Sequence, residues 1–190
     1  MNLIGYWGSN TISDLIKAYI PIFFIILFSK LFDLQYEGMW AIFLMFPLAI
    51  VPFTYVTSFI FVNDTIAQIM TLFLHFLGGG IMPLVVYTLQ IIPSTISTGD
   101  QLRWWMCLLP TYCVGESIIW SSSSVLLIEA REAQPNLPQV NTELWSLHNL
   151  GGNVLILAGH FFVGIALLAL IESDLFSCKN LTVKSLPEPR

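Results

Sequence analysis

The residues in this sequence best suited to chemistry are three ionisable side chains that interrupt long apolar stretches, His75, Glu116 and His160. An ionisable group inside a bilayer is costly and usually marks a functional position. For each histidine, the alternative is a hydrogen bond that holds neighbouring helices together. For Glu116, it is a shallow, hydrated position near the membrane surface. A membrane-embedded enzyme would need all three residues to converge, and their spacing does not require this.

Motifs for enzymatic chemistry are absent from the sequence. It has no Gly-Lys dipeptide, so it has no Walker A motif to cradle a nucleotide phosphate. It also has no HExxH, GxSxG or paired CxxC motif. Three cysteines form neither a metal motif nor a disulfide framework, and we expect them to be packing residues, with a Cys107–Cys113 disulfide as the alternative. The sequence therefore predicts no catalytic, metal or cofactor site in this chain.

The composition is that of a membrane protein. Of the 190 residues, 56% are hydrophobic and only 10% are charged, whereas a soluble domain is roughly 25% charged. The net charge of -5 and the lack of a basic run argue against a nucleic-acid partner. We therefore expect a multi-pass integral membrane protein with membrane lipids as its surroundings.

Four segments are long and apolar enough to cross a bilayer as helices, which takes about 20 residues. They cover residues 15–34, 38–62, 66–92 and 149–171. We place Pro21 in the first turns of its helix, where a missing N–H costs least. The predicted fold class is all-α, a polytopic helical membrane protein.

The region between the third and fourth spans has a different character. Residues 93–103 are polar and are predicted to form a loop. Residues 104–128 are apolar but are broken by proline, glycine, Glu116 and a serine run into pieces of about ten residues. Pieces of that length favour re-entrant helices on the exoplasmic side, with a fifth full span as the alternative. Residues 129–146 are predicted to be an exoplasmic loop.

Four crossings place both termini on the same side of the membrane. The positive-inside rule associates basic residues near the spans with the cytosol. The basic residues on the terminal side are Lys17, Lys179, Lys184 and Arg190, and those on the other side are Lys30, Arg103 and Arg131. This balance predicts that both termini are cytosolic.

Four short motifs, in order along the chain, resemble those of one transporter family. They are Tyr-Trp-x-Ser-Asn with Asp14 and Pro21 in residues 6–21, Pro-x-x-Tyr-x-x-Ser-Phe-x-Phe in 52–61, Leu-Pro-x-Tyr-Cys-x-Gly in 109–115, and Leu-Ile-Glu in 170–172. The sequence resembles the C-terminal part of a transmembrane half in the A subfamily of ABC transporters, an ABC-2 type membrane domain. Glu116 departs from the family, where an Arg or another polar residue can occur, so no role is carried over to it.

The resemblance implies a division of the chain and a set of partners. Residues 1–14 would end a cytosolic coupling region, in which Asn10 and Asp14 are the coupling candidates. Residues 15–172 would form the transmembrane domain, and residues 173–190 a cytosolic linker. The first two spans, an exoplasmic domain and the nucleotide-binding domain would lie outside this chain, which would then be a fragment. ATP and Mg would bind that nucleotide-binding domain, and it and the other transmembrane half would be partners in cis or in trans.

The function implied is the membrane-spanning part of an ATP-driven transporter, whose relatives in the A subfamily mostly move lipids or sterols. The alternative is a small non-ABC multi-pass protein or a channel. A channel would need a polar stripe along its spans, and the second and third spans carry no charge. Asp14 has a simpler alternative role as a first-turn residue favoured by the helix dipole.

Overall fold

The computed structural model describes residues 3–32, 38–61, 63–133, 145–147 and 149–184, and all of its regular elements are helical. The elements in order are α1 (Leu3–Leu31), α2 (Met39–Ser58), α3 (Asp64–Phe76), the π-helical turn η1 (Leu77–Ile81), α4 (Met82–Ile91), α5 (Ile96–Met106), α6 (Pro110–Ala133) and α7 (Leu150–Lys184). The predicted all-α class is confirmed.

Four stretches of helix are long and apolar enough to span a membrane, as the sequence predicted. They are Gly8–Leu31 in α1, Met39–Ser58 in α2, Thr65–Ile91 across α3, η1 and α4, and Leu150–Ile171 in α7. Asn63 caps the third one, since its side chain accepts a hydrogen bond from the Thr65 amide at 3.0 Å.

The first span differs from the prediction at its N-terminal end. Helix α1 begins at Leu3 and not near Leu15, so the residues expected to end a coupling region are already helical. Pro21 therefore lies inside the helix, and its placement in the first turns was wrong. Its ring leaves the carbonyl of Lys17 without a helical partner, a break that neighbouring helices can compensate in a membrane.

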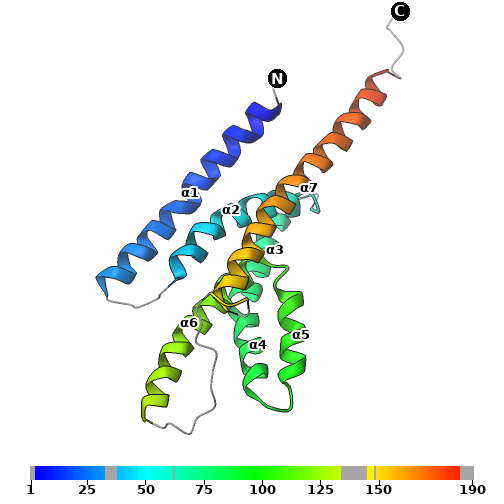
Figure 1. The fold of residues 1–190 in the computed structure, drawn as a ribbon. Helices are drawn as coiled ribbons and strands as arrows, with labels where there is room; N and C mark the ends of the chain where they lie inside the picture. Colours follow the sequence, from blue (N-terminus) through cyan, green and yellow to red (C-terminus); the bar gives the residue numbers. More distant parts are fainter. Residues whose placement is uncertain (1–2, 33–37, 62, 134–144, 148, 185–190) are drawn as a thin grey trace, which may run out of the picture.

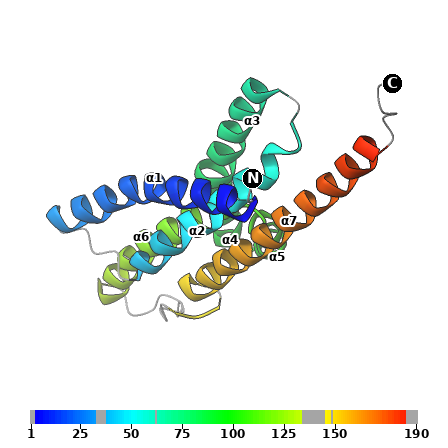
Figure 2. The same ribbon diagram turned by 90° about the horizontal axis from the view of Figure 1, so that it is seen from above.

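The spans are arranged around α2. In its apolar stretch, 44% of the residues are buried, whereas the share is 6% in the span of α1, 17% in the third span and 11% in the span of α7. Figure 1 shows α1 and α2 running in opposite directions, with the start of α1 and the end of α7 at the same end of the molecule. Seen from above, α3 and α7 diverge from the centre in different directions (Figure 2).

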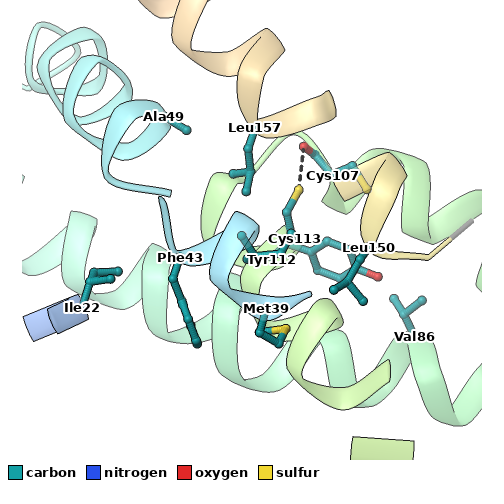
Figure 3. Packing of buried hydrophobic residues seen from close by; sticks show 11 residues of the cluster. Ile22, Met39, Phe43, Ala49, Val86, Cys107, Tyr112, Cys113, Leu150 and Leu157 are labelled. Atoms are coloured by element: carbon teal, nitrogen blue, oxygen red, sulfur yellow. Dashed lines mark hydrogen bonds between the residues drawn. The ribbon is translucent and has the colours of Figure 1, made fainter. Parts of the chain in front are cut away.

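The buried core joins α2 to the helices around it (Figure 3). Its largest fully buried apolar side chains are those of Tyr112, Met39, Ile42, Leu150 and Leu157. Small residues allow the closest approaches. A Cβ added at Gly164 of α7 would lie 2.9 Å from the Cβ of Pro52 in α2. Burial of α2 thus follows from close packing against α7 as much as from its composition.

Residues 93–133 differ most from the prediction. The expected polar loop 93–103 is helical from Ile96 onward, and α6 runs unbroken for 24 residues through the serine run. Serine is tolerated there because the side chains of Ser122, Ser123 and Ser124 each donate to a carbonyl three or four residues earlier. A turn at residues 107–109 reverses the chain between the two helices, which we call the hairpin although α5 packs along α4. The start of α5 and the end of α6 lie at the lower end in Figure 1.

Two predicted segments are only partly within the described residues. In the predicted loop 129–146, residues 129–133 belong to α6, and residues 134–144 lie outside the described part of the chain. In the predicted linker 173–190, α7 continues as far as Lys184, and residues 185–190 lie outside it.

Candidate functional site

A buried ion pair joins the two helices of the hairpin. The guanidinium Nε of Arg103 in α5 donates to the carboxylate Oε1 of Glu116 in α6 at 2.5 Å. The side chains are 4% and 16% exposed. Two charges at this depth are tolerable only as a pair, because removing one leaves the other uncompensated. The pair therefore ties α5 to α6 and explains how Glu116 is accommodated.

Burial and the ion pair together shift the pKa values of Arg103 and Tyr112. Burial disfavours the charged form of Arg103, but the Glu116 carboxylate more than offsets this and raises the pKa of the guanidinium. Burial also raises the pKa of the Tyr112 phenol, and the Glu116 charge adds to that shift. Tyr112 thus stays protonated, and its hydroxyl faces Glu116 Oε1 at 3.4 Å. The site holds one positive and one negative charge.

A cavity of about 170 Å³ lies beside this ion pair. Its walls come from α4, α5, α6 and the start of α7, and they include the ion pair, Tyr87, Trp120 and Asn153. At its α4 side, Gln90 donates from Nε2 to Asp100 Oδ1 at 2.9 Å and so links α4 to α5. The cavity is therefore a partly open space between four helices, lined by both polar and apolar side chains.

Three buried polar atoms of residues on the cavity wall have no hydrogen-bond partner among the described residues. They are Arg103 Nη2, Glu116 Oε2 and Asn153 Oδ1. The amide nitrogen of Asn153 is satisfied, since it donates to Ser117 Oγ at 2.9 Å and to the Cys113 carbonyl at 3.3 Å. An unsatisfied buried donor or acceptor costs about 1–3 kcal/mol. These atoms are therefore strong candidates to contact whatever fills the cavity.

The two intramembrane histidines lie elsewhere, at the turn of the hairpin. Nε2 of His160 lies 3.0 Å from the Leu108 carbonyl oxygen, and Nδ1 of His75 lies 3.5 Å from Thr111 Oγ1. The ring of Phe53 in α2 contacts both imidazoles, with centroid separations of 6.1 Å to His75 and 6.4 Å to His160. The histidines thus connect α3 and α7 to the hairpin, which is the helix-linking alternative that the sequence left open.

Glu116 does not share a site with the histidines. Among the described residues, its hydrogen bonds go to Arg103 and Tyr112. His160 instead bonds to the turn, and His75 to Thr111 at the start of α6. The convergence that a membrane-embedded enzyme would require is not observed. No group of three or more His, Cys, Asp or Glu residues in the described part of the chain could hold a metal ion.

The coupling candidates Asn10 and Asp14 lie one helical turn apart in α1, and both are half-buried. The Asp14 carboxylate forms a salt bridge with Lys17 at 3.0 Å and accepts a hydrogen bond from the Tyr55 hydroxyl of α2. Asp14 thus joins the first span to the second. Its alternative role as a first-turn residue favoured by the helix dipole is wrong, because α1 begins at Leu3 and has no acidic residue in its first turn. A role of either residue in coupling stays a prediction.

Two of the cysteines are packing residues, as expected. Cys107 and Cys113 are buried free thiols, and the Cys113 Sγ lies 3.9 Å from the Cys107 carbonyl oxygen (Figure 3). The side chain of Cys178 lies outside the described part of the chain.

Sequence reasoning missed Arg103, Asn153 and Tyr55 as site residues. Arg103 was assigned to a loop, although a buried Glu116 needs a cation and Arg103 is the nearest one in sequence. Asn153 gave a weaker signal, as an amide in the first turn of an apolar helix. Nothing in the spacing of Tyr55 and Asp14, 41 residues apart, indicated their contact.

Comparison with known proteins gives one match. Residues 1–170 match the family described as "ABC-2 family transporter protein", which covers nearly the whole chain. No curated protein and no solved structure matches significantly.

Proposed function

The chain belongs to the ABC-2 family of transporter proteins, and we propose that it is the membrane-spanning part of an ATP-driven transporter of the A-subfamily type that moves a lipid or another hydrophobic substrate. Membrane domains of this family have no catalytic activity of their own, and they pair with nucleotide-binding domains. Membership of the family rules out the alternative of a small non-ABC membrane protein.

The family match carries the transporter assignment, and two further observations support a hydrophobic substrate. The second and third spans, Met39–Ser58 and Thr65–Ile91, contain no Asp, Glu, Lys or Arg, so they lack the stripe of charged side chains expected of an ion path. Apolar side chains on α1, α3 and α7 are exposed, among them Phe23, Phe73 and Phe162 at 63%, 58% and 68%. A lipid can move along such a surface without leaving an apolar environment. The assignment to the A subfamily rests on the four motifs.

We propose that ATP-driven motion enters through the N-terminal end of α1. A nucleotide-binding domain, in cis or in trans, would bind ATP and Mg and move the segment around Asn10. The link from Asp14 to Tyr55 would pass this motion from α1 to α2. Because α2 is the most buried span and packs extensively on α7, a shift of α2 would also move the core side chains packed against it.

We also propose an orientation for the chain, with both termini in the cytosol and the α5–α6 hairpin re-entering from the exoplasmic side. The support is the positive-inside balance together with the common end of the molecule shared by the start of α1 and the end of α7. A single cysteine introduced at Asn136 is expected to react with a membrane-impermeant maleimide added outside intact cells. Reaction only after permeabilisation would reverse the orientation.

Transport itself is tested in sealed membrane vesicles that contain this chain together with its nucleotide-binding domain. A fluorescent phospholipid in one leaflet is followed by its accessibility to a quencher in the medium. ATP is expected to speed the loss or gain of accessibility relative to vesicles that lack the chain. Equal rates with and without the chain, in vesicles whose ATPase is active, would contradict a lipid substrate.

A further inference from the structure

The cavity beside the Arg103–Glu116 pair has an unequal set of unpaired polar atoms. One is a donor, Arg103 Nη2, and two are acceptors, Glu116 Oε2 and Asn153 Oδ1. Arg103 and Asn153 are only 4% and 2% exposed, so bulk water does not readily satisfy them. A group that complements the cavity must therefore bring one acceptor for the arginine and at least two donors for the oxygens.

The charges of Arg103 and Glu116 further limit which chemical group can bind in the cavity. Arg103 and Glu116 compensate each other, so an occupant with a net charge would bring a buried charge that has no counter-charge of its own. An occupant that carries both charges, with its anion toward Arg103 and its cation toward Glu116, leaves neither exposed. The rings of Tyr87 and Trp120 also line the cavity and are suited to contact a cation.

We propose that this cavity binds a small zwitterion that carries a primary ammonium and an anionic oxygen group. A primary ammonium has three N–H donors, enough for Glu116 Oε2 and Asn153 Oδ1 together. A phosphate or carboxylate oxygen would accept from Arg103 Nη2, a charge-assisted hydrogen bond. A trimethylated ammonium has no N–H donor and would leave both acceptor oxygens unpaired.

The size of the cavity sets the size of the occupant. Its volume of about 170 Å³ is far above the ~10–15 Å³ that a single water requires, and below the ~300 Å³ at which drug-sized sites begin. It suits an ethanolamine phosphate group, whether as the headgroup of a phospholipid or as the free compound. The acyl chains of a phospholipid would lie outside it, beyond its open side. This inference assigns binding to the cavity and not movement, so it goes beyond the proposed function and needs no ATP to test.

The test uses the purified full chain in detergent, with thermal unfolding and isothermal titration as readouts. The soluble probes are phosphoethanolamine and its trimethylated counterpart phosphocholine. The lipid probes are dioleoyl phosphatidylethanolamine and dioleoyl phosphatidylcholine added to the micelles. Each ethanolamine probe is expected to bind at least tenfold more tightly than its choline counterpart, because only the former supplies N–H donors.

Variants locate the binding. Glu116→Gln removes the negative charge and is expected to weaken ethanolamine binding at least tenfold. Trp120→Leu leaves the ion pair intact and removes an aromatic wall, so it keeps the test valid if the first variant does not fold. Ser122→Ala is the matched control, since Ser122 is exposed on the same helix and bonds only within it.

Binding of the lipid but not of the free compound assigns the site to a headgroup, the reverse assigns it to a soluble zwitterion, and both support the proposed chemistry. Equal binding of ethanolamine and choline probes would overturn the role of the ammonium donors. No binding of any probe would mean that the cavity holds water only, and binding unchanged in both cavity variants would mean that the probe binds elsewhere. Either result would overturn the proposal. None of these results bears on ATP-driven transport.

Discussion

Replacing Gly115 with alanine perturbs the contact that presses the hairpin against the third span. A Cβ at Gly115 in α6 would lie 2.1 Å from the Gly79 carbonyl oxygen of η1 and 2.7 Å from Cγ of Pro83 in α4. Nonbonded carbon atoms prefer about 3.5–4.0 Å, so the helices must separate by about 1 Å or more. The nearest atom belongs to the backbone, so a side-chain rotation cannot relieve the clash.

The expected cost follows from these distances. Overpacking a well-packed site costs about 1–3 kcal/mol, and alanine returns up to about 1 kcal/mol through its higher helix propensity. We expect Gly115→Ala to lower the free energy of unfolding by about 1–2 kcal/mol. The midpoint of thermal unfolding in detergent should then fall by several degrees. Because Glu116 is the next residue, the displaced helix should also weaken ethanolamine binding in the neighbouring cavity.

Gly80→Ala is the matched control for this measurement. Gly80 is in the same π-helical turn as Gly79, but a Cβ there would meet nothing within 4 Å. Its unfolding midpoint should stay the same or rise. If Gly115→Ala unfolds at the same temperature as Gly80→Ala or above it, the close approach of α6 to η1 is wrong.

Three further substitutions test the ion pair, the histidine contact at the turn and the link between α1 and α2. Arg103→Leu should destabilise the protein by about 3–5 kcal/mol because it leaves Glu116 charged and without its partner. Combining it with Glu116→Leu should recover much of this loss in the same thermal assay. A double variant as unstable as the single one would refute the pairing. His160→Ala should cost about 1–3 kcal/mol by removing the partner of the Leu108 carbonyl. The exposed control Gly159→Ala should keep the same stability or gain up to about 1 kcal/mol. Tyr55→Phe should reduce ATP-dependent transport more than it reduces thermal stability, and unchanged transport would remove the α1–α2 link from the coupling route.

The four spans could be predicted because each is a long apolar stretch, and length and composition decide whether a helix crosses a membrane. Helix α5 could not, because its polar residues, including Gly99 and Asp100, have the composition of a loop. Tertiary packing makes it helical: Gly99 lets α5 approach α4 so closely that an added Cβ would lie 2.9 Å from Gln90 Cγ. Local composition carries no information about such an approach.

The candidate site was predicted only in part for a related reason. Glu116 stood out as a lone acidic residue in an apolar segment, but its meaning depends on Arg103, which lies on a different helix. The three sequence candidates were ranked together because each is ionisable. The fold separates them into an ion pair with a cavity and a pair of histidines that hold the turn. That division depends on where the hairpin packs against the spans, which is a matter of tertiary structure.

The central claim is that these spans move a hydrophobic substrate with energy from an attached or associated nucleotide-binding domain. The most direct measurement compares lipid translocation in vesicles that hold this chain with either an active nucleotide-binding domain or one whose Walker A lysine has been replaced. We expect ATP-dependent translocation with the active domain and none with the variant. Translocation that is equal in the two vesicle populations, or absent from both while the active domain hydrolyses ATP, would contradict the claim.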